Sequence, residues 1–316
     1  YYGGGASTND STGGGGSGYT GSPRLSNTVM YGYNVEATKN IWINNYLIEK
    51  EGFLKVGDTI FNSFDDAVAA IETEGTITVI RDSSVQETGT IPAGKTITLD
   101  LNGHTLTSSL SFINQGTFII KDSTEDKEGK ITNIKTNAIQ NRGTLTVESG
   151  TINTTVNATT ILQYANSTVN VEEGAVISGY RGIGASEASN SSININGGII
   201  RVSEHAIYTN QNGIVVNIND SELTSTGATA IYMNCWSCNA SSLTIEGGSV
   251  TGADYGIYNY YSGNVSITDA TVTTTSTNRD RYAIWKYYNK LILNDGAYIK
   301  APNASGIYLE AEFEMN

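Results

Sequence analysis

The sequence is poor in cysteine, histidine and proline, and it contains no long apolar run. Among its 316 residues there are 2 Cys, 2 His and 3 Pro. So few histidines and cysteines leave little material for a zinc site or for histidine-based catalysis. No segment approaches the roughly 18 consecutive apolar residues of a membrane-spanning helix. We therefore expect no membrane span.

Basic residues are scarce as well. Lys and Arg together number 18 against 31 Asp and Glu, which gives a formal net charge of −13. A surface that binds nucleic acid needs clustered Lys and Arg to neutralise phosphates, and the sequence has no such cluster. It therefore predicts no nucleic-acid partner.

Glycine and tyrosine, by contrast, are abundant, with 35 and 19 residues, and Asn, Ser and Thr are frequent. This composition, with few Lys, is typical of an extracellular protein surface that is exposed to proteases. The chain opens on Tyr1 without the basic and apolar regions of a signal peptide. We therefore expect a processed form or a piece of a longer protein.

Residues 1–27 form a Gly/Ser-rich segment of low complexity. Such a composition buries too little apolar surface to offset the entropy of ordering, which predicts a flexible linker. The alternative is that the stretch from Gly13 to Asn34 belongs to a glycine-rich domain, since it resembles the end of such domains in bacterial surface and phage-associated proteins.

Residues 28–74 carry short segments of alternating polarity and one brief helical pattern. The pattern extends from Ser63 to Glu72, and Asp66 follows Ser63 at the spacing of a capping box. A helix of this length needs packing against another element to be stable.

From residue 75 to residue 316 the sequence repeats, with a period of 22 to 27 residues. Short segments of alternating polarity are separated by Gly and Asn, which tolerate left-handed turns. Two rows of aliphatic residues share the period. The first row contains Val147, Val171, Ile195, Ile218, Ile245, Ile267 and Leu293. The second row contains Ile139, Ile161, Ile183, Ile207, Ile231, Ile257, Ile284 and Ile307.

A period of this length with β-type alternation is typical of a β-solenoid. A single coil cannot bury its own aliphatic side, whereas stacked coils bury it in a continuous column. The sequence therefore predicts an all-β fold, a right-handed parallel β-helix of about ten coils. The short helix is expected to cover the open edge of the first coil.

The segment from Val56 to Ser108 carries a more specific pattern, in which a short helix and a first coil lead to LDLNGH at residues 99–104. It resembles the beginning of pectin-lyase-like β-helix modules in large bacterial surface proteins of the adhesin-like kind. The resemblance covers roughly residues 56–301. It implies the parallel β-helix fold but no particular activity, because this fold carries both enzymes and inert scaffolds.

An aromatic residue follows the second aliphatic row in five successive repeats. These residues are Tyr208, Tyr232, Tyr258, Trp285 and Tyr308. Neighbouring side chains of a strand point to opposite faces, so an inward isoleucine turns the next ring to the solvent. Two positions further along are Asn210, Asn234, Tyr260, Tyr287 and Glu310. The small residue before each isoleucine is expected to lie outward as well, leaving a shallow trough beside an exposed aromatic strip.

Aromatic rings beside hydrogen-bonding groups suit sugars, which stack on rings through C–H groups and form hydrogen bonds through hydroxyls. The strip therefore predicts a glycan or a host-cell-surface partner, bound by its rings and by Asn210 and Asn234. Two alternatives remain. The rings could stack from coil to coil and only stabilise the sheet, or a neighbouring domain could cover them.

Cys235 and Cys238 form a CxxC motif in one of the longer coils. The sequence has no second cysteine pair with which to complete a zinc site. A local disulfide in an oxidising compartment is the favoured interpretation, and two reduced cysteines are the alternative.

Polysaccharide lyases and hydrolases of this fold need carboxylates on adjacent coils, as acid and base or as calcium ligands. In this sequence Glu204 and His205 lie in a coil, but the neighbouring coils have Gly182 and Thr229 at the equivalent position. We therefore expect a non-catalytic, adhesin-like and glycan-binding module without metal or cofactor. The alternatives are a polysaccharide lyase or glycoside hydrolase, and a structural stalk or tail-spike-like element.

Overall fold

The computed structural model describes residues 41–43, 46–48, 52–185 and 189–316, with the backbone alone at 41–43, 46–48, 236–239 and 261–262. The predicted linker over residues 1–27 lies outside the described residues. The chain divides into two compact units, residues 1–52 and 53–316. In the first unit, Ile41–Ile43 (β1) and Tyr46–Ile48 (β2) form an antiparallel pair.

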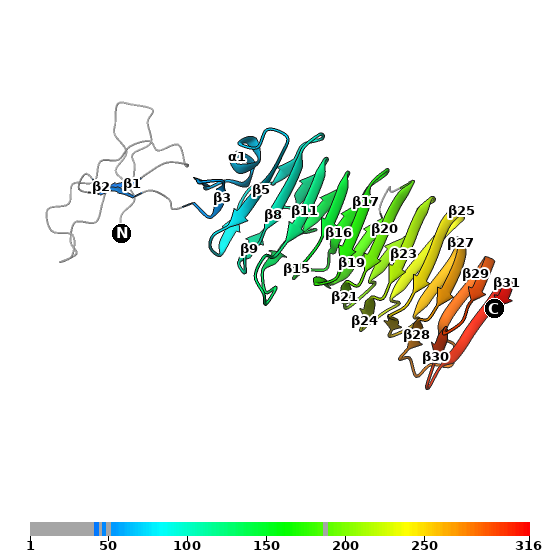
Figure 1. Ribbon diagram of the computed structural model, residues 1–316. Helices are drawn as coiled ribbons and strands as arrows, with labels where there is room; N and C mark the ends of the chain where they lie inside the picture. Colours follow the sequence, from blue (N-terminus) through cyan, green and yellow to red (C-terminus); the bar gives the residue numbers. More distant parts are fainter. Residues whose placement is uncertain (1–40, 44–45, 49–51, 186–188) are drawn as a thin grey trace, which may run out of the picture. The chain divides into compact units, whose positions relative to one another are not determined.

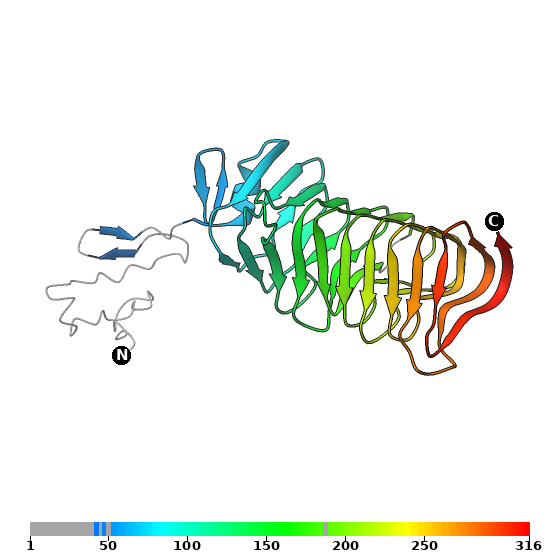
Figure 2. The same ribbon diagram turned by 60° about the horizontal axis from the view of Figure 1, so that its bottom comes forward.

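The second unit is a parallel β-solenoid of about ten turns (Figure 1). The described residues are nearly all β, with 59% in strands and 2% in helix, which confirms the all-β prediction. Successive coils follow one another in sequence order in both views (Figure 1, Figure 2). Each typical coil contributes one strand to each of three parallel stacks.

The first stack, here called the ladder face, contains β7 (Thr90–Ile91), β10 (Phe112–Asn114), β13 (Ile139–Asn141), β16 (Thr159–Gln163), β19 (Arg181–Ala185) and β22 (Ile207–Thr209). The second stack contains β5 (Glu74–Val79), β8 (Thr96–Asp100), β11 (Thr117–Lys121), β14 (Thr144–Val147), β17 (Thr168–Glu172), β20 (Ser191–Asn196) and β23 (Ile214–Asn219). Four long strands then run through both stacks and join them into one sheet: β25 (Ile231–Glu246), β27 (Ile257–Thr268), β29 (Tyr282–Leu293) and β31 (Ser305–Met315).

The third stack is a separate sheet of ten strands. It contains β6 (Ser83–Val85), β9 (Thr105–Ser108), β12 (Lys130–Asn133), β15 (Gly150–Thr154), β18 (Ala175–Gly179), β21 (Ile199–Val202), β24 (Glu222–Ser225), β26 (Ser249–Gly252), β28 (Thr271–Thr274) and β30 (Tyr298–Lys300). The apolar residues of the three stacks face one another and form the core.

Both predicted aliphatic rows pair residue by residue. On the ladder face, parallel pairing joins each isoleucine of the second row, from Ile139 to Ile307, to the next. The first row pairs in the same way from Val147 to Leu293. All members of both rows are buried except Ile307, which is 36% exposed. Ile307 differs because β31 is the last strand of the stack.

Before the first coils, β3 (Leu54–Val56) and β4 (Thr59–Phe61) form a hairpin, followed by the helix α1 (Phe64–Ala69). The Ser63 side chain accepts a hydrogen bond from the Asp66 backbone N–H at 3.2 Å, which confirms the predicted N-cap. The helix is shorter than the Ser63–Glu72 pattern suggested. The buried Phe64 ring packs edge-on against Phe112, with the centroids 4.9 Å apart. The position of α1 over the open edge of the first coil stays a prediction.

No helix in the described part of the chain combines the length and the apolar character that crossing a membrane requires.

Candidate functional site

The structure brings the five predicted aromatic residues together in one row on the ladder face. Parallel pairing places Tyr208 beside Tyr232, and then Tyr258, Trp285 and Tyr308 in turn. Adjacent ring centroids are 4.4 to 5.4 Å apart, and adjacent ring planes lie within 6° of parallel. We call these five residues the aromatic ladder.

The rings of the aromatic ladder face one another rather than the solvent. Strands of neighbouring coils lie about 4.8 Å apart, so rings at equivalent positions stack in offset pairs along the solenoid. Each ring is only partly buried and lies outside the aliphatic column, as predicted. However, neighbouring rings cover both flat faces of Tyr232, Tyr258 and Trp285, so a ligand would meet the edges of these rings.

A second, shorter row lies beside the aromatic ladder. Asn234 pairs with Tyr260, Tyr260 with Tyr287, and Tyr287 with Glu310. The Tyr260 and Tyr287 rings are 5.0 Å apart and tilted by 43°. A hydrogen bond to Glu310 is the main cause that raises the pKa of Tyr287 to about 12.

The two predicted asparagines lie at this margin. Asn234 Nδ2 donates to the hydroxyl of Tyr232 at 2.8 Å. Asn210 is exposed, just after the end of β22, and its Oδ1 accepts from Gln211 Nε2 at 2.8 Å. Amide groups therefore accompany the aromatic ladder on at least two coils.

The predicted trough beside the rings is wrong for four of the five coils, and only Gly306 on the last strand is exposed. Ala206, Ala230 and Ala283, each preceding a ladder-face isoleucine, are fully buried. At Gly256, an added Cβ would lie 2.6 Å from Val272 Cγ1. These small residues occupy the corner between the third stack and the ladder face, where the chain packs too tightly for larger side chains.

Two ion pairs lie on the other margin of the aromatic ladder. Arg181 binds Glu204 of the next coil through two hydrogen bonds, one of them 3.0 Å from Nη2 to Oε1. Arg281 Nε lies 3.4 Å from Asp254 Oδ1. The Arg181 guanidinium also lies 5.0 Å from the Tyr208 ring centroid, a cation–π distance.

His205 lies between these ion pairs and the rings. Its imidazole stacks on Tyr208 and Tyr232, with the centroids 5.6 and 4.9 Å apart. Burial lowers the pKa of His205, so the ring is neutral at pH 7. Its Nδ1 lies 2.8 Å from the carbonyl oxygen of Thr229, so Nδ1 carries the proton and Nε2 is an acceptor.

This arrangement is poorly suited to acid–base catalysis. Burial acts to raise the pKa of the Glu204 carboxyl, but the hydrogen bond and charge of Arg181 outweigh it, so this pKa is lowered. A glycosidase needs one carboxyl group that stays protonated, and Glu204 does not provide it. Among the described residues, no group of three His, Cys, Asp or Glu side chains could hold a metal ion.

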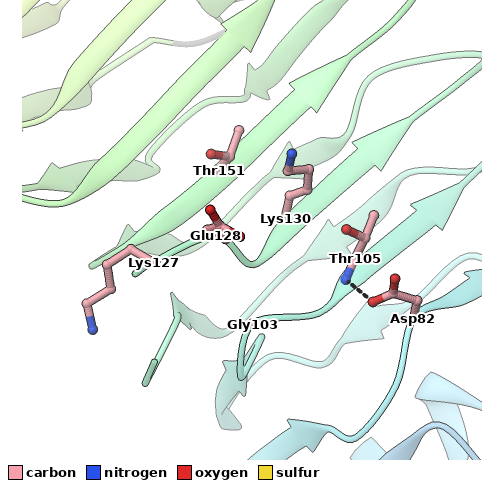
Figure 3. Close-up of a pocket in the computed structure, with 7 residues that line it drawn as sticks. All are labelled: Asp82, Gly103, Thr105, Lys127, Glu128, Lys130 and Thr151. Carbon is pink, nitrogen blue, oxygen red and sulfur yellow. Dashed lines mark hydrogen bonds between the residues drawn. The ribbon is translucent and has the colours of Figure 1, made fainter. Parts of the chain in front are cut away.

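A polar hollow on the third stack was not predicted. Figure 3 shows the residues that line this hollow, and its volume is about 460 Å³. Its lining residues are Asp82, Gly103, Thr105, Lys127, Glu128, Lys130 and Thr151. Lys130 pairs with Thr105 and Thr151 in the sheet, while Lys127 and Glu128 come from the loop between β11 and β12. This loop is longer than the two-residue connections of the next six coils, and that insertion is the sequence signal that could have located the hollow.

Cys235 is buried and disulfide-bonded. The side chain of Cys238 lies outside the described residues, so the local pairing of the two cysteines stays a prediction.

Comparisons of the chain with known protein families, with curated proteins and with solved structures gave no match.

Proposed function

We propose that the chain is a non-catalytic, glycan-binding β-helix module of an adhesin-like protein at the bacterial cell surface, and that the aromatic ladder and its margins are the binding surface. The observation that carries the proposal is the row of five outward aromatic residues in register on successive coils. Tyrosine combines a large apolar ring with a hydroxyl group that binds polar ligands.

The stacking of the rings determines how such a surface would bind. A sugar cannot lie flat on a ring whose faces are already covered by neighbouring rings. A glycan chain that runs along the solenoid would instead meet ring edges, tyrosine hydroxyls and the Asn234 amide, repeated at the spacing of the coils. This spacing is similar to the length of one pyranose unit, so successive sugars could make equivalent contacts.

The proposal is tested by removing hydroxyl groups while the stacked rings are kept. In the double variant Tyr232→Phe/Tyr258→Phe we expect affinity for a glycan identified on an array to fall about 5- to 30-fold. This range corresponds to the loss of two hydrogen bonds of about 0.5 to 1 kcal/mol each. Titration calorimetry with the purified glycan measures the change.

The matched control is Tyr298→Phe, because Tyr298 is 61% exposed and lies on the third stack. We expect this variant to bind like the wild type. Equal affinity of the double variant and the wild type would exclude the tyrosine hydroxyls from binding and would contradict the proposal.

The near-parallel stacking of the rings also favours a second candidate function, a structural stalk in which the aromatic ladder only stabilises the solenoid. The double variant Tyr258→Ala/Trp285→Ala distinguishes the two. A lower Tm with unchanged glycan binding would support the stalk, whereas loss of binding by a folded variant would support the glycan-binding module.

A further inference from the structure

We infer that the ligand of the aromatic ladder is an uncharged glycan, and that Glu204 and Asp254 select it by accepting hydrogen bonds from its hydroxyl groups. The inference rests on the proposed function and specifies the class of ligand. Three features of the described residues lead to it: the pairing of the cations, the position of the two carboxylates, and the hydrogen-bonding character of the groups around them.

Two arginines beside the aromatic ladder are already paired. Arg181 is bound to Glu204, and Arg281 is bound to Asp254. Lys286, on the ladder-face segment of β29, is fully buried in the core. A uronate or sulfated glycan needs cationic partners at the surface, and the chain as a whole carries a net charge of −13. An acidic glycan would therefore be repelled from this face rather than bound.

The two carboxylates occupy equivalent positions on coils that are two steps apart. Each lies three residues before a ladder-face isoleucine, Ile207 or Ile257, and the coil between them has Ala228 at this position. The Asp254 backbone N–H donates to the Ala228 carbonyl oxygen at 3.1 Å, so the coil of Asp254 lies directly beside the coil of Ala228. Two coil spacings correspond to roughly 10 Å, which leaves room for one sugar between the carboxylates.

Both carboxylates are accessible from the solvent. The Glu204 side chain is 21% exposed and the Asp254 side chain is 47% exposed. Each carboxylate oxygen has more than one lone pair, so an oxygen that accepts from an arginine can accept a further hydrogen bond from a hydroxyl group. The arginines thus hold the carboxylates in place without using all of their hydrogen-bonding capacity.

The groups beside these carboxylates include a further acceptor and a hydroxyl donor. His205 is neutral, with Nδ1 directed at the Thr229 carbonyl oxygen, which leaves Nε2 as an acceptor. The Tyr232 hydroxyl accepts a hydrogen bond from Asn234 and keeps its own proton for donation. Carboxylate oxygens and an imidazole nitrogen that accept hydrogen bonds suit a ligand rich in O–H groups, and an uncharged glycan supplies these without placing a negative charge beside Glu204 and Asp254.

The experiment measures binding to two neutral polymers, mannan and mixed-linkage β-glucan, and to two acidic ones, polygalacturonate and alginate, at low and high salt. For the wild-type chain we expect at least tenfold tighter binding to a neutral polymer, with little dependence on salt. In Glu204→Gln/Asp254→Asn we expect about tenfold weaker binding to that polymer, because the charged acceptors are lost. We also expect binding to the acidic polymers to increase, since Arg181 and Arg281 are released.

Glu222→Gln is the matched control, because Glu222 pairs with Arg201 in a similar inter-coil ion pair on the third stack. It should leave the preference unchanged, and circular dichroism confirms that each variant is folded. Salt-sensitive binding of the wild type to an acidic polymer, lost in Tyr232→Phe/Tyr258→Phe, would overturn this inference and leave the proposed function intact. Failure of all four polymers and of a glycan array to bind would overturn both.

Discussion

At the scale of single residues, the most unusual feature is a lysine in the core. Lys286 is fully buried, and its Nζ donates to Asn259 Oδ1 and to the Gly263 carbonyl oxygen, both at 2.7 Å. Its position two residues after Ile284 predicts an inward side chain, since strand residues alternate. Residue type alone suggests the opposite, because a lysine is ordinarily expected at the surface.

Lys286 makes stability depend on pH. Burial lowers its pKa from 10.5 to about 7, so between these values the unfolded chain binds more protons than the folded chain. The free energy of unfolding should therefore rise with pH across this window. Urea unfolding at several pH values measures the slope. In Lys286→Met, which places an apolar side chain of similar length beside Leu309 of the next coil, we expect this contribution to disappear.

The control is Lys300→Met, which replaces an exposed lysine on β30. Its slope between about pH 7 and 10.5 should match that of the wild type. If Lys286→Met keeps the wild-type slope, another group is responsible for the pH dependence.

At the scale of the strands, the sequence predicts register and the direction of side chains within strands, which follow from alternation. It does not predict the geometry of the corners and loops between strands. The register of the rows from Ile139 to Ile307 and the outward position of the aromatic ladder follow from period-two alternation within strands. Ala206 precedes the first residue of β22, so it belongs to a corner and alternation does not apply to it. The Arg181–Glu204 pair and the polar hollow also depend on turn geometry, which the repeat alone does not determine.

The tight corner can be tested at its glycines. In Gly256→Ala the new Cβ would lie 2.6 Å from Val272 Cγ1 and 2.8 Å from the Ala283 carbonyl oxygen. We expect a loss of stability of about 1 to 3 kcal/mol from this overpacking, seen as a lower urea midpoint. Gly306→Ala is the matched control on the last coil, because a Cβ there meets nothing within 4 Å. Equal midpoints for the two variants would show that the corner relaxes.

At the scale of the whole solenoid, each coil contacts only the coils before and after it. Stability in such a molecule is approximately a sum of coil and interface contributions. The aromatic ladder spans the coils from β22 to β31, whereas coils nearer α1 are held by aliphatic residues and by rings such as Phe112 and Phe118. Replacing rings of the aromatic ladder should therefore destabilise only the coils that carry or adjoin them.

Hydrogen exchange can show whether loss of ladder rings destabilises only the nearby coils. In Tyr258→Ala/Trp285→Ala the stacking of Tyr232 on Tyr258 and of Trp285 on Tyr308 is lost. We expect amide protection to fall in β25, β27 and β29 and to stay at the wild-type level in β8, β11 and β14, measured by mass spectrometry of peptides. The variant Tyr258→Phe/Trp285→Phe keeps flat rings at both positions and should retain most of the protection. A uniform decrease along all coils would mean that the solenoid unfolds as one cooperative unit, in which the aromatic ladder stabilises distant coils as much as its own.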